Sequence, residues 1–132
     1  MKKRALIVGA GIAGPVLAVA LRRAGFEPRV VEAYPEGASR HGGSWLTVAV
    51  NGLAALSTFD LQRAVLDVSF PSREIELVNG AGRRLGVASL GGVLPDGTPT
   101  QTVKRADLHR MLLEAAEREG VPVSYGVRLA SA

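Results

Sequence analysis

The chain of 132 residues has no cysteine and only two histidines. Without cysteine there can be no disulfide framework, no thiolate nucleophile and no cysteine-bound metal, and the composition is compatible with a cytoplasmic location. His41 and His109 are too isolated in the sequence to suggest a metal site. We therefore expect no metal and regard both histidines as ordinary polar positions.

Aromatic residues make up only 5% of the chain, and the basic residues form no cluster interleaved with them. The formal net charge of +4 suits phosphate-bearing ligands, but this pattern does not favour a nucleic-acid partner. The uncharged stretch 5–21 is short for a membrane span and contains glycine and proline. With 47% hydrophobic residues, the chain is expected to fold as a single domain covering residues 1–132.

Glycine is abundant, and three glycines near the N-terminus have the spacing of a dinucleotide-binding fingerprint. Gly9, Gly11 and Gly14 follow an apolar run at 5–8 that lacks alternation, as in a strand buried in a parallel sheet. In such a motif Gly9 turns the chain, Gly11 lets the backbone approach a pyrophosphate, and Gly14 lets a helix pack closely on the strand. A lone motif of this kind is weak, so its surroundings decide its value.

Those surroundings are a helix and a second strand. The helix is expected to begin near Ile12, so that the first backbone N–H groups, including that of Ala13, favour a pair of phosphates. Gly25 is placed to end this helix. The next strand, 29–32, ends in Glu32, where a carboxylate accepts ribose hydroxyls and repels a 2′-phosphate. This arrangement favours FAD or NAD over NADP.

The same N-terminal segment has a competing interpretation. Basic residues at 2–4, the apolar stretch and the small residues 18–20 are also typical of a secretory signal. That interpretation leaves the glycine spacing and Glu32 unexplained, so we favour dinucleotide binding.

Further elements are predicted along the chain. Residues 33–44 form a loop, Asn51 is a plausible N-cap for a helix through Leu61, and 74–78 pairs with 83–88 as a hairpin. A helix over 106–119 and a strand over 121–125 follow. The helix has an apolar face whose members recur at helical spacing: Leu108, Met111, Leu112, Ala115 and Ala116.

Together with the glycine motif and Glu32, two further segments carry a resemblance. They are Gly43-Ser44-Trp45-Leu46-Thr47-Val48-Ala49-Val50-Asn51-Gly52-Leu53 and Arg105-Ala106-Asp107-Leu108-His109. Over essentially its whole length the chain resembles the FAD-dependent monooxygenases of the aromatic hydroxylase type. The resemblance implies an α/β fold: a Rossmann-like FAD-binding βαβ unit with a small inserted β element at roughly 70–102, incomplete relative to the full flavoprotein fold.

The resemblance also implies a set of cofactor-binding residues. The pyrophosphate of FAD would meet the glycine loop and helix start, the ribose would meet Glu32 with Ala33 beside it, and Arg105 would reach the phosphates. The strand expected around 126–129, with Leu129, resembles the family segment whose backbone contacts adenine. From the residues alone, Arg105 at the edge of a helix is suited to a phosphate or a ribose oxygen, but it is equally typical of a solvated helix end.

Three departures from the family pattern stand out. Ala33 and Tyr34 occupy positions where many members have a basic residue, so an adenosine contact is missing or replaced by stacking. Trp45 stands where a small glycine is frequent, and we expect it to be a core aromatic. The family's later Asp-Gly and Gly-Asp segments do not occur before Ala132, so we expect weak flavin binding by the monomer and no turnover without a C-terminal half. The edge of strand 5–8 would then be open to a partner chain or a second copy.

The function expected from the resemblance is FAD binding within a monooxygenase that uses NAD(P)H and O₂ to hydroxylate a small organic or aromatic substrate. Two alternatives remain: an NAD-binding module of another oxidoreductase, and a non-catalytic remnant that self-associates. An amine-oxidase-type flavoprotein is suggested by Arg40-His41-Gly42-Gly43, but the Arg105 helix speaks against it. We assign no catalytic residue, because nothing in their spacing separates four carboxylates from solvated ones: Asp60, Asp67, Glu74 and Glu76.

Overall fold

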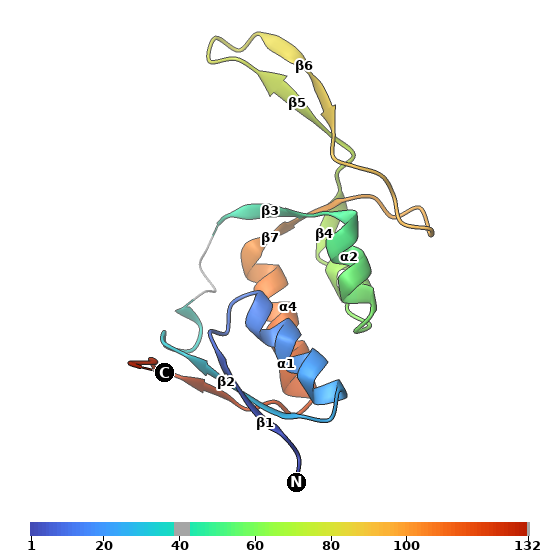
Figure 1. Cartoon of the computed structure of the whole chain (residues 1–132). Helices are drawn as coiled ribbons and strands as arrows, with labels where there is room; N and C mark the ends of the chain where they lie inside the picture. Colours follow the sequence, from blue (N-terminus) through green and yellow to red (C-terminus); the bar gives the residue numbers. More distant parts are fainter. Residues whose placement is uncertain (39–42, 132) are drawn as a thin grey trace. The chain divides into compact units, whose positions relative to one another are not determined.

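The computed structural model describes residues 1–38 and 43–131 (Figure 1). The chain divides into two compact units: unit 1 comprises Met1–Ser44 and Arg105–Ala132, and unit 2 comprises Trp45–Lys104. Arg40, His41 and Gly42 lie outside the described residues, and with them most of the amine-oxidase-like stretch and one of the two histidines.

Unit 1 is built around a parallel sheet in the order β1-β2-β8. Its elements are β1 (Arg4–Val8), α1 (Ala13–Arg23), β2 (Glu27–Glu32), α4 (Arg105–Arg118) and β8 (Val123–Tyr125). The strand, helix and second strand predicted from the glycine motif are confirmed, and so is a mixed α/β fold with a parallel sheet. In the register of β1 and β2, Val8 lies opposite Val31, directly before the glycine loop.

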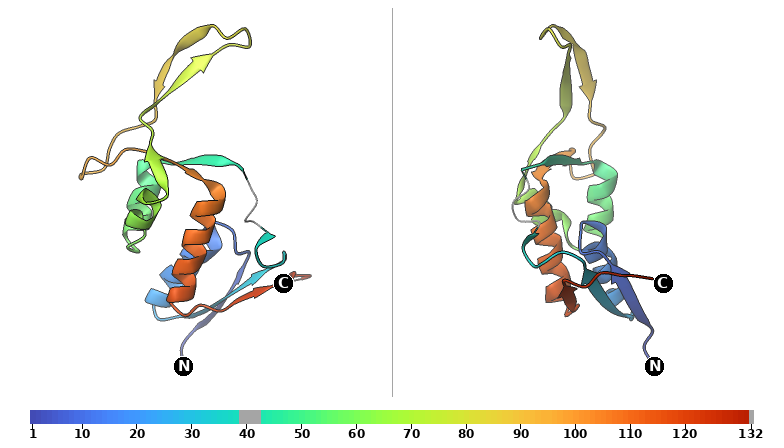
Figure 2. Two further views of the ribbon diagram at one scale, coloured as in Figure 1. Left: turned by 180° about the vertical axis from the view of Figure 1, so that it is seen from behind. Right: turned by 90° about the vertical axis from the view of Figure 1, so that its left-hand side faces the viewer.

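The helices α1 and α4 pack against each other, and α1 also contacts β1 and β2 (Figure 2). The predicted apolar face of α4 is confirmed, since all five of its members are buried. Ile7 and Val30 are buried in the sheet, whereas Leu6 and Val8 of β1 are exposed, so the predicted burial of the run 5–8 is wrong for one face of the strand. At the far ends of the two helices, Arg23 forms a salt bridge of 2.9 Å with Glu119.

Unit 2 contains antiparallel strands and two short helices. Its elements are β3 (Trp45–Val48), α2 (Val50–Ser57), α3 (Gln62–Leu66), β4 (Ser69–Pro71), β5 (Glu74–Val78), β6 (Arg84–Ser89) and β7 (Gln101–Lys104). The order β3-β7-β4 forms one sheet, and β5 with β6 forms the predicted hairpin. The buried side chains Leu53, Val65 and Val103 form the centre of its small core.

Two predictions in unit 2 are wrong. Asn51 is not the N-cap of its helix: Ala49 holds that position, α2 ends at Ser57, and the Asn51 side chain accepts the N–H of Gly52 instead. Trp45 is not a core aromatic, because 53% of it is exposed. Its ring lies against that of Phe70, with 5.6 Å between centroids, and beside the ammonium group of Lys104. A four-residue strand in a small sheet leaves one of its faces uncovered.

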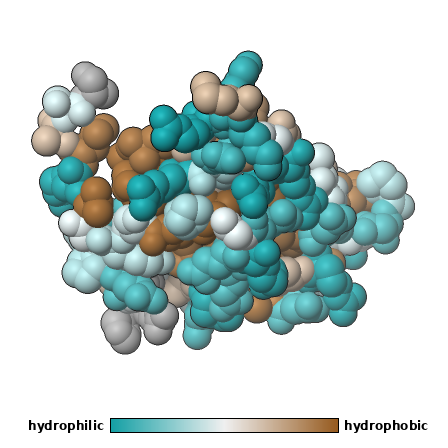
Figure 3. All heavy atoms as spheres, turned by 90° about the horizontal axis from the view of Figure 1, so that it is seen from below, coloured by the Kyte–Doolittle hydropathy of each residue, from teal (hydrophilic) through white to brown (hydrophobic). Residues whose placement is uncertain are grey.

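Large hydrophobic side chains reach the surface in both units. In unit 2 they concentrate on the hairpin, at Ile75, Leu77, Val78, Leu85 and Val87. On the face shown in Figure 3, hydrophobic atoms reach the surface in several places between hydrophilic ones. Within the described parts of the chain, no helix combines the length and the apolar character needed to cross a membrane.

Candidate functional site

The glycine loop connects β1 to α1 and turns sharply at its first residue. Gly9 has a φ of 102°, in the region that side chains rarely adopt, and its N–H donates to the carbonyl of Val31 at 2.8 Å. The helix α1 then begins at Ala13 with Ile12 as N-cap, close to the predicted start. Among the residues that the structure describes, no side chain caps this end, and the first turn contains no acidic residue. The helix dipole and the first N–H groups are therefore suited to an anion.

The other two glycines of the loop have different reasons to be glycine. A Cβ at Gly14 would lie far inside contact distance of the Gly9 carbonyl oxygen, so helix and loop require glycine there. A Cβ at Gly11 would meet no atom of the described residues within 4 Å, apart from its chain neighbours. Gly11 also lines a cavity. The described residues thus leave free the space beside Gly11, where the backbone of a dinucleotide-binding loop approaches a pyrophosphate.

Glu32, at the end of β2, faces the glycine loop. Its Oε2 accepts the N–H of Ala10 at 2.8 Å and its Oε1 accepts the N–H of Tyr34 at 2.9 Å. The hydrogen bonds from Tyr34 and then Ala10 lower the pKa of Glu32 below its ordinary value of 4.5. The carboxylate is ionised at neutral pH and retains lone pairs that suit the hydroxyls of a ribose.

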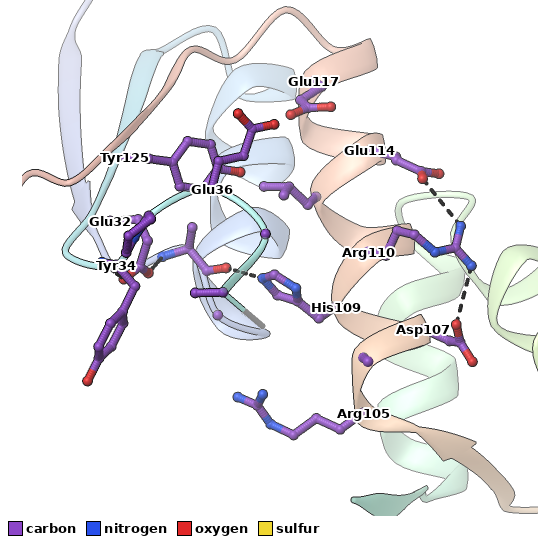
Figure 4. Close-up of a pocket in the computed structure, with 17 residues that line it drawn as sticks. Glu32, Tyr34, Glu36, Arg105, Asp107, His109, Arg110, Glu114, Glu117 and Tyr125 are labelled. Carbon is purple, nitrogen blue, oxygen red and sulfur yellow. Dashed lines mark hydrogen bonds and ion pairs between the residues drawn. The ribbon is translucent and has the colours of Figure 1, made fainter. Parts of the chain in front are cut away.

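The first turns of α4 bring two basic side chains to the same loop (Figure 4). Arg105 and His109 are four residues apart and therefore lie on one face of the helix. The Nε2 atom of His109 lies 2.6 Å from the carbonyl oxygen of Ala10. Sequence reasoning treated His109 as an ordinary polar position, but the structure places it against the glycine motif. Its helical spacing from Arg105 was the one signal that could have shown this.

These groups surround a cavity of about 580 Å³, and the described residues that line it all belong to unit 1. Of the predicted cofactor-binding residues, it brings together Gly11, Glu32 and Arg105. The lining does not include six of them: Gly9, Ile12, Ala13, Gly14, Ala33 and Leu129. Residues that sequence reasoning did not assign to a site also line it, among them His109 and Tyr125.

Charge is distributed unevenly along the cavity. Arg110 forms ion pairs with Asp107 and Glu114 of its own helix, so its charge is offset. For Arg105, no ion pair is found within the described part of the chain, and its backbone N–H donates to the carbonyl of Ser44 at 2.9 Å. Glu117 lies towards the other end of α4 (Figure 4). The end beside the glycine loop is thus the one that suits phosphate groups.

The adenine segment differs from its prediction. β8 ends at Tyr125, so 126–129 is not a strand, and 46% of Leu129 is exposed. The Gly126 and Val127 N–H groups donate to the carbonyls of Tyr34 and Glu32, which holds this segment beside the end of β2. Arg128 lies 6.0 Å from the centre of the Tyr34 ring. Tyr34 thus has a basic side chain over its ring, at a position where many members of the resembled family have a basic residue.

The carboxylates that were weighed and not assigned as catalytic all belong to unit 2. Asp67 forms an exposed ion pair with Arg63, and Glu76 forms one with Arg84. Unit 1 thus brings together groups whose chemistry suits a nucleotide: a helix N-terminus and an arginine suit phosphates, and a carboxylate suits ribose hydroxyls.

Comparison with known proteins agrees with this geometry. Residues 2–132 match the family described as FAD binding domain. The chain is 32% identical over 112 residues to 3-amino-4-hydroxybenzoate 2-monooxygenase of Streptomyces cremeus, covering 83% of this chain and 28% of that enzyme. The chain spans about a third of the length of the curated relatives it matches.

Solved structures show the same fold. The tetrameric form of 2-methyl-3-hydroxypyridine-5-carboxylic acid oxygenase superposes with a TM-score of 0.83 at 26% identity, over 99% of this chain and 33% of that one. CtdE in complex with FAD and a substrate superposes with a TM-score of 0.81 at 21% identity, over 96% of this chain and 31% of that one. At that identity the second likeness concerns the fold alone.

Proposed function

The chain belongs to the FAD-binding domain family, and we propose that it is the cofactor-binding N-terminal part of a flavin-dependent monooxygenase. In this proposal the fold is Rossmann-like, residues 1–132 act as one domain, and 70–102 is the inserted β element. The relatives it matches are about three times as long, so turnover is proposed to require further sequence. The cytoplasmic location stays a prediction.

The observation that carries the proposal is the open space beside Gly11 between an uncapped helix N-terminus and Arg105. In the proposal the N–H groups of the loop, with Ile12 and Ala13, bind the pyrophosphate of FAD. Arg105 adds a positive charge from α4, and its guanidinium group can form two parallel hydrogen bonds to one phosphate. Gly9 and Gly14 support the site by shaping the turn.

The adenosine half of the cofactor would occupy the side of the cavity beside β2. The ionised Glu32 accepts the ribose hydroxyls and disfavours a 2′-phosphate, while Ala33 leaves room beside it. The Tyr34 ring and the backbone of 126–129, ending at Leu129, are proposed to contact the adenine. These residues orient the cofactor and exclude water, and none of them is proposed to transfer a proton.

Bound flavin supplies the redox chemistry: it accepts electrons, here proposed to come from NAD(P)H, and activates O₂ for hydroxylation of a small organic or aromatic substrate. No residue of this chain is assigned to that chemistry. Its part is to hold the ADP portion of the cofactor in a fixed position relative to the sequence that completes the enzyme.

A partner for the sheet is part of the proposal. β1 is at the edge of the sheet formed by the described strands, and its Leu6 and Val8 are exposed. An apolar strand with an unpaired edge favours addition of another strand, from a partner chain or from a second copy. Sedimentation over a range of concentrations tests this: growth of oligomers supports an open edge, and a monomer at all concentrations contradicts it.

The function is tested by titrating the purified chain with FAD, with NAD and NADP as comparators, while flavin fluorescence and protein mass are followed. Saturable binding of FAD, weaker or absent binding of NAD and no binding of NADP are expected, with weak affinity in the monomer. Preference for NAD would support a module of another oxidoreductase. Binding of neither nucleotide by the folded chain would contradict an autonomous cofactor site and favour a self-associating remnant.

A further inference from the structure

The peptide groups on both sides of Ala10 are held by side chains from distant parts of unit 1. Its N–H donates to Oε2 of Glu32 at 2.8 Å, and its carbonyl oxygen lies 2.6 Å from Nε2 of His109. Glu32 ends β2, whereas His109 lies on α4, 99 positions along the chain from Ala10. Ala10 itself is buried, with 2% of its surface exposed.

The chemistry of these atoms fixes where the proton lies. A carbonyl oxygen can only accept a hydrogen bond, so Nε2 of His109 must carry the proton. Both the neutral Nε2–H tautomer and the imidazolium satisfy this requirement. The Glu32 carboxylate, on the other side, is only an acceptor. A donor and an acceptor side chain therefore hold Ala10 from its two ends, and exchanging their roles is impossible.

This contact also fixes the orientation of the next residue. The peptide between Ala10 and Gly11 is planar and trans, so its C=O and N–H point in opposite directions. A carbonyl held by His109 thus sets the direction of the Gly11 N–H. Gly11 has no Cβ, so its own backbone dihedrals are less restricted than those of any other residue type. The contact with His109 therefore restrains a peptide group that the glycine itself leaves free to rotate.

The contact has an electrostatic consequence as well. A carbonyl oxygen with a free lone pair beside a pyrophosphate would repel it, because both carry negative charge. The proton on His109 offsets that partial charge. Together with Arg105 one turn earlier, it makes the first turns of α4 a donor surface facing the glycine loop.

We propose that His109 is a positioning residue for the cofactor: through Ala10 it locks the Ala10–Gly11 peptide in the phosphate-binding orientation before the cofactor arrives. This rests on the proposed binding of FAD. It assigns to His109 a role that neither the motif nor the cofactor contacts require, since His109 acts through the backbone and not on the phosphates. If His109 acted through packing alone, FAD binding would depend on the ring of His109 and not on the proton of its Nε2 atom.

The test compares His109→Ala with His109→Gln, whose amide nitrogen reaches the place of Nε2 as a donor. Arg118→Ala, at an exposed site on the same helix, is the control. Loss of one hydrogen bond predicts about five- to tenfold weaker FAD binding for His109→Ala, and near wild-type binding for His109→Gln and the control. Equal binding by His109→Ala and wild type overturns the proposal, and so does a His109→Gln variant as weak as His109→Ala.

Two measurements without FAD separate this proposal from the proposed function. The order parameter of the Gly11 amide, which belongs to the locked peptide, is measured by ¹⁵N relaxation and should fall in His109→Ala but stay unchanged in His109→Gln. If the alanine variant does not fold, the ¹⁵N shifts of His109 in the wild-type chain decide. A protonated Nε2 supports the lock, and a bare Nε2 overturns it. Failure of the wild-type chain to bind FAD would instead contradict the proposed function. The two NMR measurements would still show whether His109 fixes the Ala10–Gly11 peptide.

Discussion

Unit 1 and unit 2 use their glycines and carboxylates in different ways. In unit 1, Gly14 is required by the close approach of the helix to the loop, and Glu32 is bound to backbone N–H groups across the fold. In unit 2, a Cβ at Gly86 would meet nothing, and Asp96 is bound to the Thr98 N–H within its own turn. Gly14 and Glu32 thus join separate elements of unit 1, whereas Gly86 has free space around it and Asp96 stabilises its own turn. In unit 1, polar contacts of this kind connect β2 and α4 to the glycine loop.

The largest expected effect comes from filling the contact between helix and loop. Gly14→Ala puts a Cβ against the Gly9 carbonyl oxygen, which is backbone and cannot move aside. We expect a loss of about 3 kcal/mol or more in the free energy of unfolding, and loss of FAD binding. Urea unfolding followed by circular dichroism measures this. Trp45, the single tryptophan, reports on unit 2 by its fluorescence in the same samples.

The matched control is Gly52→Ala in α2. Its Cβ would lie 3.3 Å from a Cγ1 of Val48, the end of a side chain that can shift. Alanine is also the better helix former, so a change within about 1 kcal/mol is expected. Equal losses for the two variants would show that Gly14 has no special place in the structure.

Gly11→Val separates binding from folding. A Cβ at this position would meet no described atom beyond the neighbouring residues within 4 Å, so we expect stability to stay near that of wild type, whereas the side chain fills the space proposed for the pyrophosphate. FAD binding should fall by about 100-fold or to below detection, which corresponds to roughly 3 kcal/mol or more. Gly86→Val, in strand β6 of unit 2, is the control and should bind FAD as wild type does. If Gly11→Val bound FAD as tightly as wild type, the pyrophosphate could not lie beside Gly11, and the proposed site would be contradicted.

Glu32 links the site to pH. Its pKa is lowered in the folded chain, so it stabilises the fold above pH 4.5, and this contribution is lost as the pH falls from there towards the folded pKa. In Glu32→Gln, the free energy of unfolding should depend less on pH below about pH 4.5. It should also weaken FAD binding roughly tenfold, because hydrogen bonds to a charged group contribute about 1.5–3 kcal/mol.

Asp96→Asn is the counterpart in unit 2. Hydrogen bonds from the Thr98 side chain and backbone lower the pKa of Asp96 as well, but the group is fully exposed. Its removal should change the pH dependence less and leave FAD binding intact, as measured by urea unfolding at several pH values and by FAD titration. Weaker FAD binding in Asp96→Asn than in Glu32→Gln would contradict the division between the units.

The smallest effect is expected at the boundary of the two units, where Lys104 and Arg105 are adjacent. Arg105→Gln should weaken FAD binding by about threefold to tenfold and reduce its dependence on salt, since an exposed charge contributes about 1 kcal/mol. Lys104→Gln removes the same charge from the neighbouring position, whose side chain lies beside Trp45. It should leave affinity nearly unchanged, and equal effects would show that only net charge matters.

Much of unit 1 could be predicted because local pattern and packing agree there. The apolar run before Gly9 and the helical spacing of Leu108 and Met111 correspond to β1 and α4 as observed. The helical spacing of His109 from Arg105 indicated their shared face, but the contact with Ala10 could not be derived, because the partner is a backbone carbonyl 99 positions away and backbone atoms have no sequence signature. Only the topology that places α4 beside the glycine loop brings the two together.

In unit 2 the errors have another cause. Asn51 has a side chain suited to an N-cap, but the chain already enters the helix at Val50, so the asparagine turns to the next N–H. Trp45 was expected in the core because of its size, yet a small sheet has too little covering structure to bury an indole. The usual preference of a residue type for a cap or for the core is a poor guide where the surrounding fold offers few groups to contact.

The central claim is that the cofactor site lies in unit 1, and the most direct test is an NMR titration of the ¹⁵N-labelled full chain with FAD. The account predicts saturable shifts for the amides of Ala10, Gly11, Glu32 and Arg105, with the amides of the hairpin β5 and β6 unchanged. Saturable shifts confined to the hairpin, or none at the glycine loop of a folded chain, would contradict it.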